Sequence, residues 1–207
     1  MVLNRRDCIA IAAAAASVGF CGPGVLAQTS SLPAHGKGKD APATTIVVVG
    51  DSLSAEYGLR RGTGWVALLE EKLKQESIPA EVINASISGD TSSGGRARLP
   101  ALLAQHHPTH VIIELGGNDA LRGLSLQATQ DNLNQMTRTA QQAGAKVVLV
   151  GMQVPPNYGA AYGEQFARLF GQVAQANKAA LVPFLLKGVA DGEDPTRLFQ
   201  SDRIHPL

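Results

Sequence analysis

The chain has 207 residues, of which 44% are hydrophobic and 17% are charged. This composition is typical of one globular domain with a hydrophobic core, and it excludes a disordered or fibrous chain. The formal net charge is +1 and no basic run alternates with aromatic residues, so the sequence gives no sign of nucleic-acid binding.

Residues 1–27 have the order of a cleavable export signal. The basic pair Arg5-Arg6 precedes an apolar stretch from Cys8 to Phe20, and small residues follow up to Ala27. The apolar stretch is shorter than the ~20 residues of a membrane-spanning helix. We therefore predict cleavage near Ala27, export to the periplasm or the medium, and no stable membrane anchor. The arginine pair leaves the twin-arginine and the general secretory routes both open.

Both cysteines of the chain, Cys8 and Cys21, lie within this signal. The mature chain is therefore predicted to have no disulfide, no thiol nucleophile and no cysteine-based metal site. Residues 28–43 are rich in Ser, Pro, Gly and Lys and predict a flexible lead-in. The folded domain is then expected to span residues 44–207.

Short β-branched runs alternate with longer amphipathic segments along the rest of the chain. In chain order, the runs predict strands over Thr45–Gly50, Ala80–Ile87, His110–Gly116, Lys146–Met152 and Leu181–Phe184. The amphipathic segments predict helices over Gly64–Ser77, Arg96–His106, Ser125–Gly144 and Tyr162–Ala180. This alternation predicts an α/β fold with a parallel, doubly wound sheet and right-handed crossovers. Ligands bind such sheets at the carboxyl ends of the strands.

Polar motifs follow the first three of these strands. They are Gly50-Asp51-Ser52, Ser88-Gly89-Asp90 and Gly116-Gly117-Asn118-Asp119, and near the end of the chain stands Asp202-Arg203-Ile204-His205. Each motif alone has a simpler explanation, as a helix N-cap, a turn, an Asx turn or surface polarity. Their occurrence in this order after successive strands favours a shared site.

The residue types of these motifs suit acyl transfer. The Ser52 hydroxyl becomes a nucleophile when a base removes its proton, and His205 is the candidate base. Asp202 lies three residues before His205, so in a turn its carboxylate can orient the imidazole. The backbone N–H groups of Ser52 and Gly89 and the side-chain amide of Asn118 can donate hydrogen bonds to an oxyanion.

The same motifs carry a resemblance to a known family. The stretches "VVVGDSLSAEYG", "INASISGDTSSGGRARLPALL", "VIIELGGNDALRG", "VPPNYG" and "SDRIHPL" resemble the SGNH (GDSL) hydrolase superfamily. Within it, they are similar to the bacterial arylesterases related to thioesterase I/lysophospholipase L1, over most of Thr45–Leu207. The resemblance implies a flavodoxin-like three-layer α/β/α sandwich and ester hydrolysis without a metal or another cofactor.

The resemblance also implies roles for particular residues. Ser52 is then the nucleophile and an oxyanion donor, Gly89 and Asn118 are the other donors, and Asp202 and His205 complete the triad. The implied substrate is a small-molecule aryl ester or a short-to-medium acyl ester, with thioesters and lysophospholipids as further candidates.

Further residues are candidates for the substrate pocket or for a metal. Pro156 and Tyr158 follow the fourth strand, and either form a stiff turn or contact the substrate; the candidates Leu53, Tyr57 and Leu121 line the same edge. The histidines of "QHHPTH" (105–110) are explained by a helix C-terminus, where imidazolium is favoured, so we predict no metal site.

Relatives usually continue beyond the His-Pro dipeptide with one more helix, which packs on the sheet. For the chain as given, ending at Leu207, we therefore expect an uncovered strip of core, a frayed segment around His205 and reduced stability. A glycan O-deacetylase and a non-catalytic or inactive protein with this fold remain alternatives. The sequence leaves the oligomeric state open.

Overall fold

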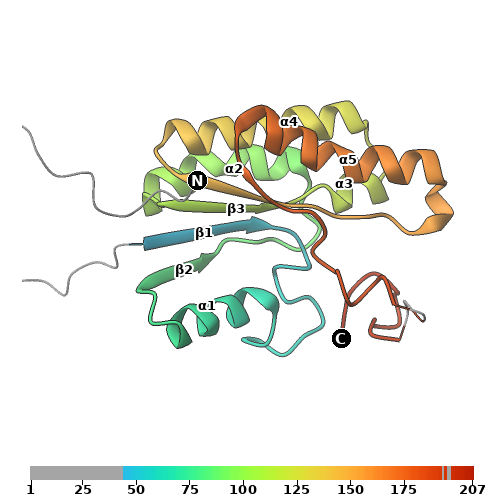
Figure 1. Ribbon diagram of the computed structural model, residues 1–207, viewed down its shortest axis with the longest axis horizontal. Helices are drawn as coiled ribbons and strands as arrows, with labels where there is room; N and C mark the ends of the chain where they lie inside the picture. The colour runs from blue at the N-terminus through green and yellow to red at the C-terminus, as the bar shows by residue number, and fades with distance from the viewer. Residues whose placement is uncertain (1–43, 193, 195–196) are drawn as a thin grey trace, which may run out of the picture. The chain divides into compact units, whose positions relative to one another are not determined.

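A parallel five-stranded sheet forms the centre of the domain (Figure 1). The computed structural model describes residues 44–192, 194 and 197–207, so the predicted signal and lead-in lie outside the described residues. The strands are β1 (Thr44–Gly50), β2 (Ala80–Asn84), β3 (His110–Glu114), β4 (Lys146–Val150) and β5 (Ala180–Val182). Their order is β2-β1-β3-β4-β5 and every neighbouring pair is parallel.

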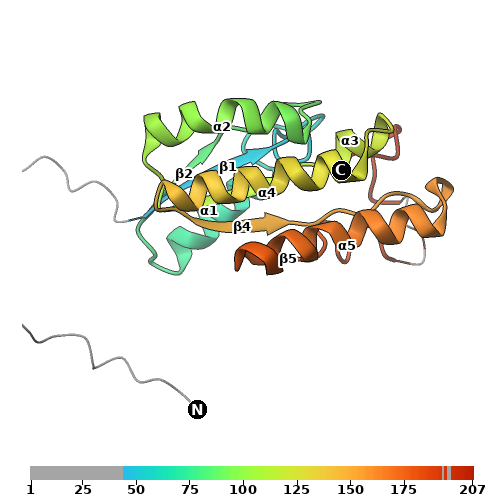
Figure 2. The same cartoon turned by 90° about the horizontal axis from the view of Figure 1, so that it is seen from above.

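Helices cover both faces of this sheet. They are α1 (Trp65–Gln75), α2 (Ser92–His106), α3 (Gly117–Leu121), α4 (Leu126–Gln142) and α5 (Ala160–Asn177). Helices α2, α4 and α5 lie side by side on one face, whereas α1 lies on the other (Figures 1 and 2). The predicted three-layer α/β/α architecture with a parallel sheet is therefore confirmed.

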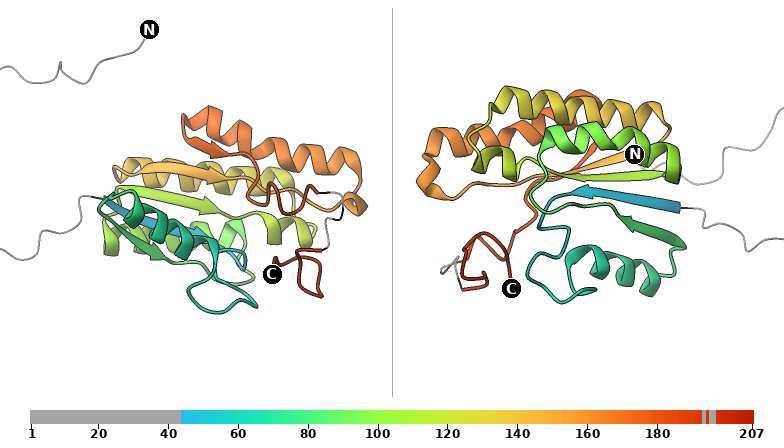
Figure 3. Two further views of the ribbon diagram at one scale, coloured as in Figure 1. Left: turned by 60° about the horizontal axis from the view of Figure 1, so that its bottom comes forward. Right: turned by 180° about the vertical axis from the view of Figure 1, so that it is seen from behind.

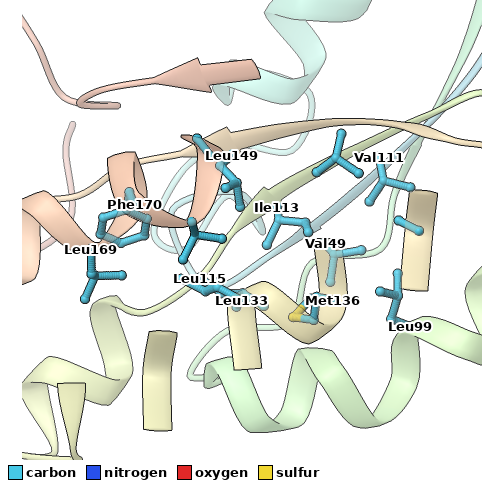
Figure 4. Packing of buried hydrophobic residues seen from close by; sticks show 14 of the residues in the cluster. Val49, Leu99, Val111, Ile113, Leu115, Leu133, Met136, Leu149, Leu169 and Phe170 are labelled. Carbon is cyan, nitrogen blue, oxygen red and sulfur yellow. The ribbon is translucent and has the colours of Figure 1, made fainter. Parts of the chain in front are cut away.

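The main core lies between the sheet and the layer of α2, α4 and α5 (Figure 4). Side chains alternate between the two faces of a strand, so every second residue of β1, β3 and β4 enters this core. The fully buried members include Val49, Ile113, Leu149, Leu133 and Phe170. Burying one such side chain stabilises the fold by about 1.5–3 kcal/mol, so this layer holds the strand ends in place.

The opposite face is covered less completely. Ile46 and Val48 are buried there, and Val66 of α1 is buried with them, but Val182 at the far edge of the sheet is 40% exposed. Leu68 of α1 is 56% exposed, so it lies outside the buried face of this helix.

Two helices differ from the sequence prediction near the site. Helix α2 begins at Ser92 rather than Arg96, because the Thr91 side chain accepts a hydrogen bond from Gly94 N and caps the helix. Pro100 is accommodated inside α2. The short helix α3 directly follows Gly116, whose φ of 119° suits glycine. Among the described residues, no helix is long and apolar enough to cross a membrane.

Candidate active site

Ser52 stands at the carboxyl end of β1, where the chain leaves the sheet. Gly50 ends the strand in close contact with its surroundings, since a Cβ there would lie 2.5 Å from Ser54 Oγ. A side chain at this position would push the turn away from the sheet. The packed turn therefore places Ser52 at the sheet edge, with its hydroxyl 2.8 Å from His205 Nε2.

His205 comes from the other end of the described chain. Residues 197–207 lie beside the loop that follows β1 at the carboxyl edge of the sheet (Figures 1 and 3). His205 Nδ1 lies 2.7 Å from Asp202 Oδ2, on the side of the ring opposite to Ser52. The structure thus brings Ser52, His205 and Asp202 together in one hydrogen-bonded row.

Asp202 is fixed as an ionised carboxylate. Its Oδ1 accepts hydrogen bonds from the backbone N–H groups of His205 at 3.0 Å and Ile204 at 2.9 Å. These two bonds, and then the bond to the imidazole, lower the pKa of Asp202 to about 2. The carboxylate is therefore charged at any pH where the imidazole needs an acceptor.

Contacts with the loop that follows β1 hold the segment around His205. The Gln200 side chain donates to the main-chain oxygens of Tyr57 at 3.0 Å and Pro206 at 2.9 Å. The Tyr57 ring packs against the His205 imidazole with a centroid distance of 4.4 Å. Gln200 N also donates to His205 O at 2.8 Å. The imidazole is therefore held both by its own loop and by the loop that carries Ser52.

The predicted oxyanion donors come from the next two loops. Ile87 N donates to Gly50 O at 3.0 Å, which brings the loop of Gly89 alongside the turn of Ser52. Gly89 has a φ of 79°, a conformation that favours glycine, and its carbonyl accepts from Arg122 Nη2 at 2.7 Å. Asn118 lies in α3, and its Nδ2 donates to Asp51 Oδ2 at 3.1 Å, directly beside Ser52.

A buried aspartate ties these two loops together. Asp119 is 2% exposed and accepts from Ser92 N at 2.8 Å, from the Ser92 hydroxyl at 2.5 Å and from the Thr129 hydroxyl at 3.2 Å. Ser92 is the first residue of α2, which follows the Gly89 loop, and Asp119 follows Asn118. The relative placement of the two candidate donors is therefore fixed by hydrogen bonds to the Asp119 side chain.

Sequence reasoning missed a second buried acidic group behind Ser52. Glu114 is completely buried at the end of β3, and Asp51 is 3% exposed. Burial, followed by the charge of Asp51, raises the pKa of Glu114 well above its usual range. Burial also raises the pKa of Asp51, against the lowering effect of the hydrogen bond from Leu53 N. The sequence does carry one sign of this group, because Glu114 directly follows the apolar residues Val111–Ile113 of β3.

The candidate pocket residues have different surroundings. Tyr57, on the loop that carries Ser52, is 51% exposed, and Leu121, the last residue of α3, is 42% exposed. Leu53 packs against the hydrophobic core. Pro156 and Tyr158 form a short 3-10 turn, and the Tyr158 ring stacks on Tyr162 with a centroid distance of 6.1 Å.

The histidines of the "QHHPTH" stretch lie near the end of α2 and the start of β3. His110 Nδ1 lies 2.9 Å from the hydroxyl of its neighbour Thr109. Among the described residues, no three His, Cys, Asp or Glu side chains come together as metal ligands would.

Comparison with known proteins identifies the family. The model of the GDSL-like lipase/acylhydrolase family matches residues 48–207, which include all the motifs of the site. The chain belongs to this family. This hydrolase is 54% identical to the esterase TesA of Pseudomonas aeruginosa over 168 residues, covering 81% of this chain and 82% of that protein.

Two further comparisons agree with this GDSL-like assignment. The thioesterase 1/protease 1/lysophospholipase L1 of Escherichia coli K12 is 42% identical over 166 residues, covering 80% of this chain and 77% of that protein. The crystal structure of TesA superposes with a TM-score of 0.75 at 54% identity, covering 79% of this chain and 89% of that one. The predicted family is confirmed, and the GDSL-like protein is an enzyme that hydrolyses carboxylic esters.

Proposed function

We propose that this esterase works through an acyl-serine intermediate formed on Ser52. The observation that carries the proposal is the row from Ser52 Oγ to His205 Nε2 at 2.8 Å and from His205 Nδ1 to Asp202 Oδ2 at 2.7 Å. A serine hydroxyl, an imidazole and a carboxylate at these separations are what nucleophilic catalysis requires.

The steps follow from the roles of the three groups. As Ser52 Oγ bonds to the ester carbonyl carbon, His205 Nε2 takes the hydroxyl proton, and Asp202 stabilises the imidazolium that results. The tetrahedral intermediate collapses, and His205 gives the proton to the departing alcohol. A water molecule then repeats the attack on the acyl group, with His205 again as the base, and releases the acid.

The oxyanion of the intermediate is assigned to three donors. These are the backbone N–H groups of Ser52 and Gly89 and the side-chain Nδ2 of Asn118. The φ of 79° at Gly89 and the bond from Asn118 to Asp51 support their fixed orientation before the substrate arrives. One such donor accelerates the reaction by about 10²–10³-fold.

For the substrate, we propose aryl esters or esters with short-to-medium acyl chains. Thioesters and lysophospholipids are included because a relative at 42% identity is named as a thioesterase and a lysophospholipase. Exposed apolar side chains beside the site, those of Tyr57 and Leu121, support contact with an apolar acyl or aryl group, and Leu53, Pro156 and Tyr158 are the other proposed contacts.

A p-nitrophenyl ester series of increasing acyl length tests the function. The wild type should hydrolyse the series with a preferred chain length, and Ser52→Ala should lose nearly all activity. A fluorophosphonate should add its mass to Ser52 of the wild type. Equal rates in both proteins, or folded wild type that the reagent does not label, would contradict the proposal.

We also propose export of the enzyme, supported by the order of residues 1–27. Arg5-Arg6, the apolar stretch Cys8–Phe20 and Ala27 have the arrangement of a cleaved signal. Cell fractionation should find the protein outside the cytoplasm, with a mature N-terminus near Gln28. Cytoplasmic protein that retains Met1 would contradict export.

A further inference from the structure

A pair of buried carboxyl groups lies directly behind the nucleophile and has no part in the steps above. The sheet register places Glu114 of β3 opposite Gly50 of β1, so its side chain meets the turn that follows Gly50. Glu114 Oε2 accepts from the Ser54 hydroxyl at 2.7 Å and from Asp51 N at 3.4 Å. Its second oxygen, Oε1, is buried and has no hydrogen-bond partner.

The two carboxyls differ in what they accept. Asp51 Oδ1 accepts from Leu53 N at 3.1 Å and Asp51 Oδ2 accepts from Asn118 Nδ2 at 3.1 Å, so both oxygens have N–H donors. Such bonds favour an ionised carboxylate. Glu114 has only the Ser54 hydroxyl as a close donor. Asp51 is therefore the better site for the negative charge.

Among the described residues, the positive charges near this pair are already engaged: the charge of His205 acts on Asp51, and the guanidinium of Arg98 is paired elsewhere. Arg98 reaches this turn, with Nη2 3.4 Å from Gly50 O, but its Nε is paired with Asp90 Oδ2 at 2.8 Å. Two neighbouring carboxylates in a buried site cannot both ionise without strong repulsion. Glu114 and Asp51 interact through their side chains, and burial raises the pKa of each. One proton shared by the two groups would remove the repulsion.

We propose that Glu114 is a positioning residue for the oxyanion hole: as a neutral carboxylic acid it donates a hydrogen bond from Oε1 to the Asp51 carboxylate, which in turn fixes the amide of Asn118. This inference rests on the proposed function, because it concerns a donor of the same site. An ionised Asp51 only accepts, so it holds Nδ2 of Asn118 on its side and excludes the flipped amide. The Nδ2 of Asn118 then keeps a second N–H for the acyl oxygen.

Two substitutions at Glu114 test whether its hydrogen bonds, rather than its volume alone, matter for catalysis. Glu114→Gln retains an acceptor for Ser54 and an N–H donor for Asp51, and we expect kcat within about threefold of the wild type. Glu114→Met has a similar size but neither group. We expect its kcat to fall about 10–10²-fold with KM within about twofold, approaching the cost of losing one oxyanion donor.

A double variant tests whether the effect passes through Asn118. Glu114→Met combined with Asn118→Ala should be no slower than Asn118→Ala alone, because the fixed group is already absent. Multiplied losses would overturn the proposal, since Glu114 would then act elsewhere. A folded Glu114→Met enzyme with wild-type kcat would overturn it, as would a Glu114→Gln enzyme as slow as Glu114→Met.

Infrared spectroscopy tests the proton without using activity. The wild type at neutral pH should show the C=O stretching band of a protonated carboxyl, shifted in D2O, and Glu114→Gln should lack it. Absence of the band from the wild type overturns the proposal, even where Glu114→Met fails to fold. Failure of the proposed function has a different signature, because Ser52→Ala would then keep its activity whatever the result at Glu114.

Discussion

Substituting Glu114 by glutamine should change how the stability of the enzyme depends on pH. The folded pKa of Glu114 is raised well above its ordinary value of 4.5, so the folded protein keeps a proton that the unfolded chain has released. The stability of the wild type is therefore greatest, in this respect, below pH ~4.5. It falls as the pH rises from there towards the folded pKa of Glu114.

The size of the effect follows from one proton. Glu114 is completely buried beside Asp51, and burial raises the pKa of both groups, so the folded protein keeps more protons than the unfolded chain as the pH rises above 4.5. A difference of one bound proton lowers the free energy of unfolding by about 1.4 kcal/mol for each pH unit. Glutamine does not titrate and can make the same hydrogen bonds. Glu114→Gln should therefore gain stability on the wild type by that amount for each pH unit between the ordinary and the folded pKa of Glu114.

Urea unfolding at 25 °C, at half-unit steps from pH 5 to pH 8, measures this difference. The exposed strand residue Glu81 provides a matched control, since Glu81→Gln removes the same charge from a surface position of β2. The free energies of Glu114→Gln and the wild type should diverge as the pH rises. Parallel profiles for these two proteins would refute the reasoning, because Glu114 would then carry no extra proton in the fold.

Three other substitutions have defined outcomes. Asp202→Asn should lower kcat by about 10³–10⁴-fold with an unchanged circular dichroism spectrum, because the acceptor 2.7 Å from His205 Nδ1 is lost; a loss below tenfold would contradict its role. Gly95→Ala should destabilise the enzyme by about 1–3 kcal/mol in urea unfolding, despite the helix preference for alanine, because its Cβ would lie 2.2 Å from Leu115 Cδ1. Gln200→Ala should lower kcat several-fold at an unchanged melting temperature, because two hydrogen bonds near His205 are lost; a lower melting temperature at full kcat would contradict this.

Much of the fold was predictable because its signals are local. The β-branched runs predicted all five strands. The continuous apolar run of β1 is typical of a strand buried on both faces. The helix capped by Ser125 was predicted for a similar reason, because a serine before an amphipathic segment satisfies its first N–H groups. The start of α2 was missed because Gly94-Gly95 indicates a break. Gly95 is instead required by close packing on Leu115, a contact that depends on the tertiary fold.

The residues of the candidate site could be predicted from the sequence, but the contacts that hold them in place could not. The order of the polar motifs after successive strands indicated Ser52, Gly89 and Asn118, because parallel strands deliver their carboxyl ends to one edge. The partnership of Asp51 with Glu114 could not be predicted, since it depends on the register that sets Gly50 against Glu114. Asp51 and Glu114 are 63 residues apart in the sequence, so no local pattern indicates their contact. The isolated Glu114 of the strand is the one hint of a buried acidic group.

The conformation of residues 52–58 argues against Ser52 as a helix N-cap. A cap requires a helix, but these residues form turns, and Tyr57 N donates to Ser52 O at 3.1 Å. The hydroxyl of Ser52 is directed to His205 Nε2, whereas the neighbouring Asp51 side chain accepts from Leu53 N as a cap would. The Asp51 side chain, and not that of Ser52, therefore accepts the hydrogen bond from the turn's backbone. This division leaves the Ser52 hydroxyl free for the imidazole, and it makes the charge on Asp51 important for both the turn and Asn118.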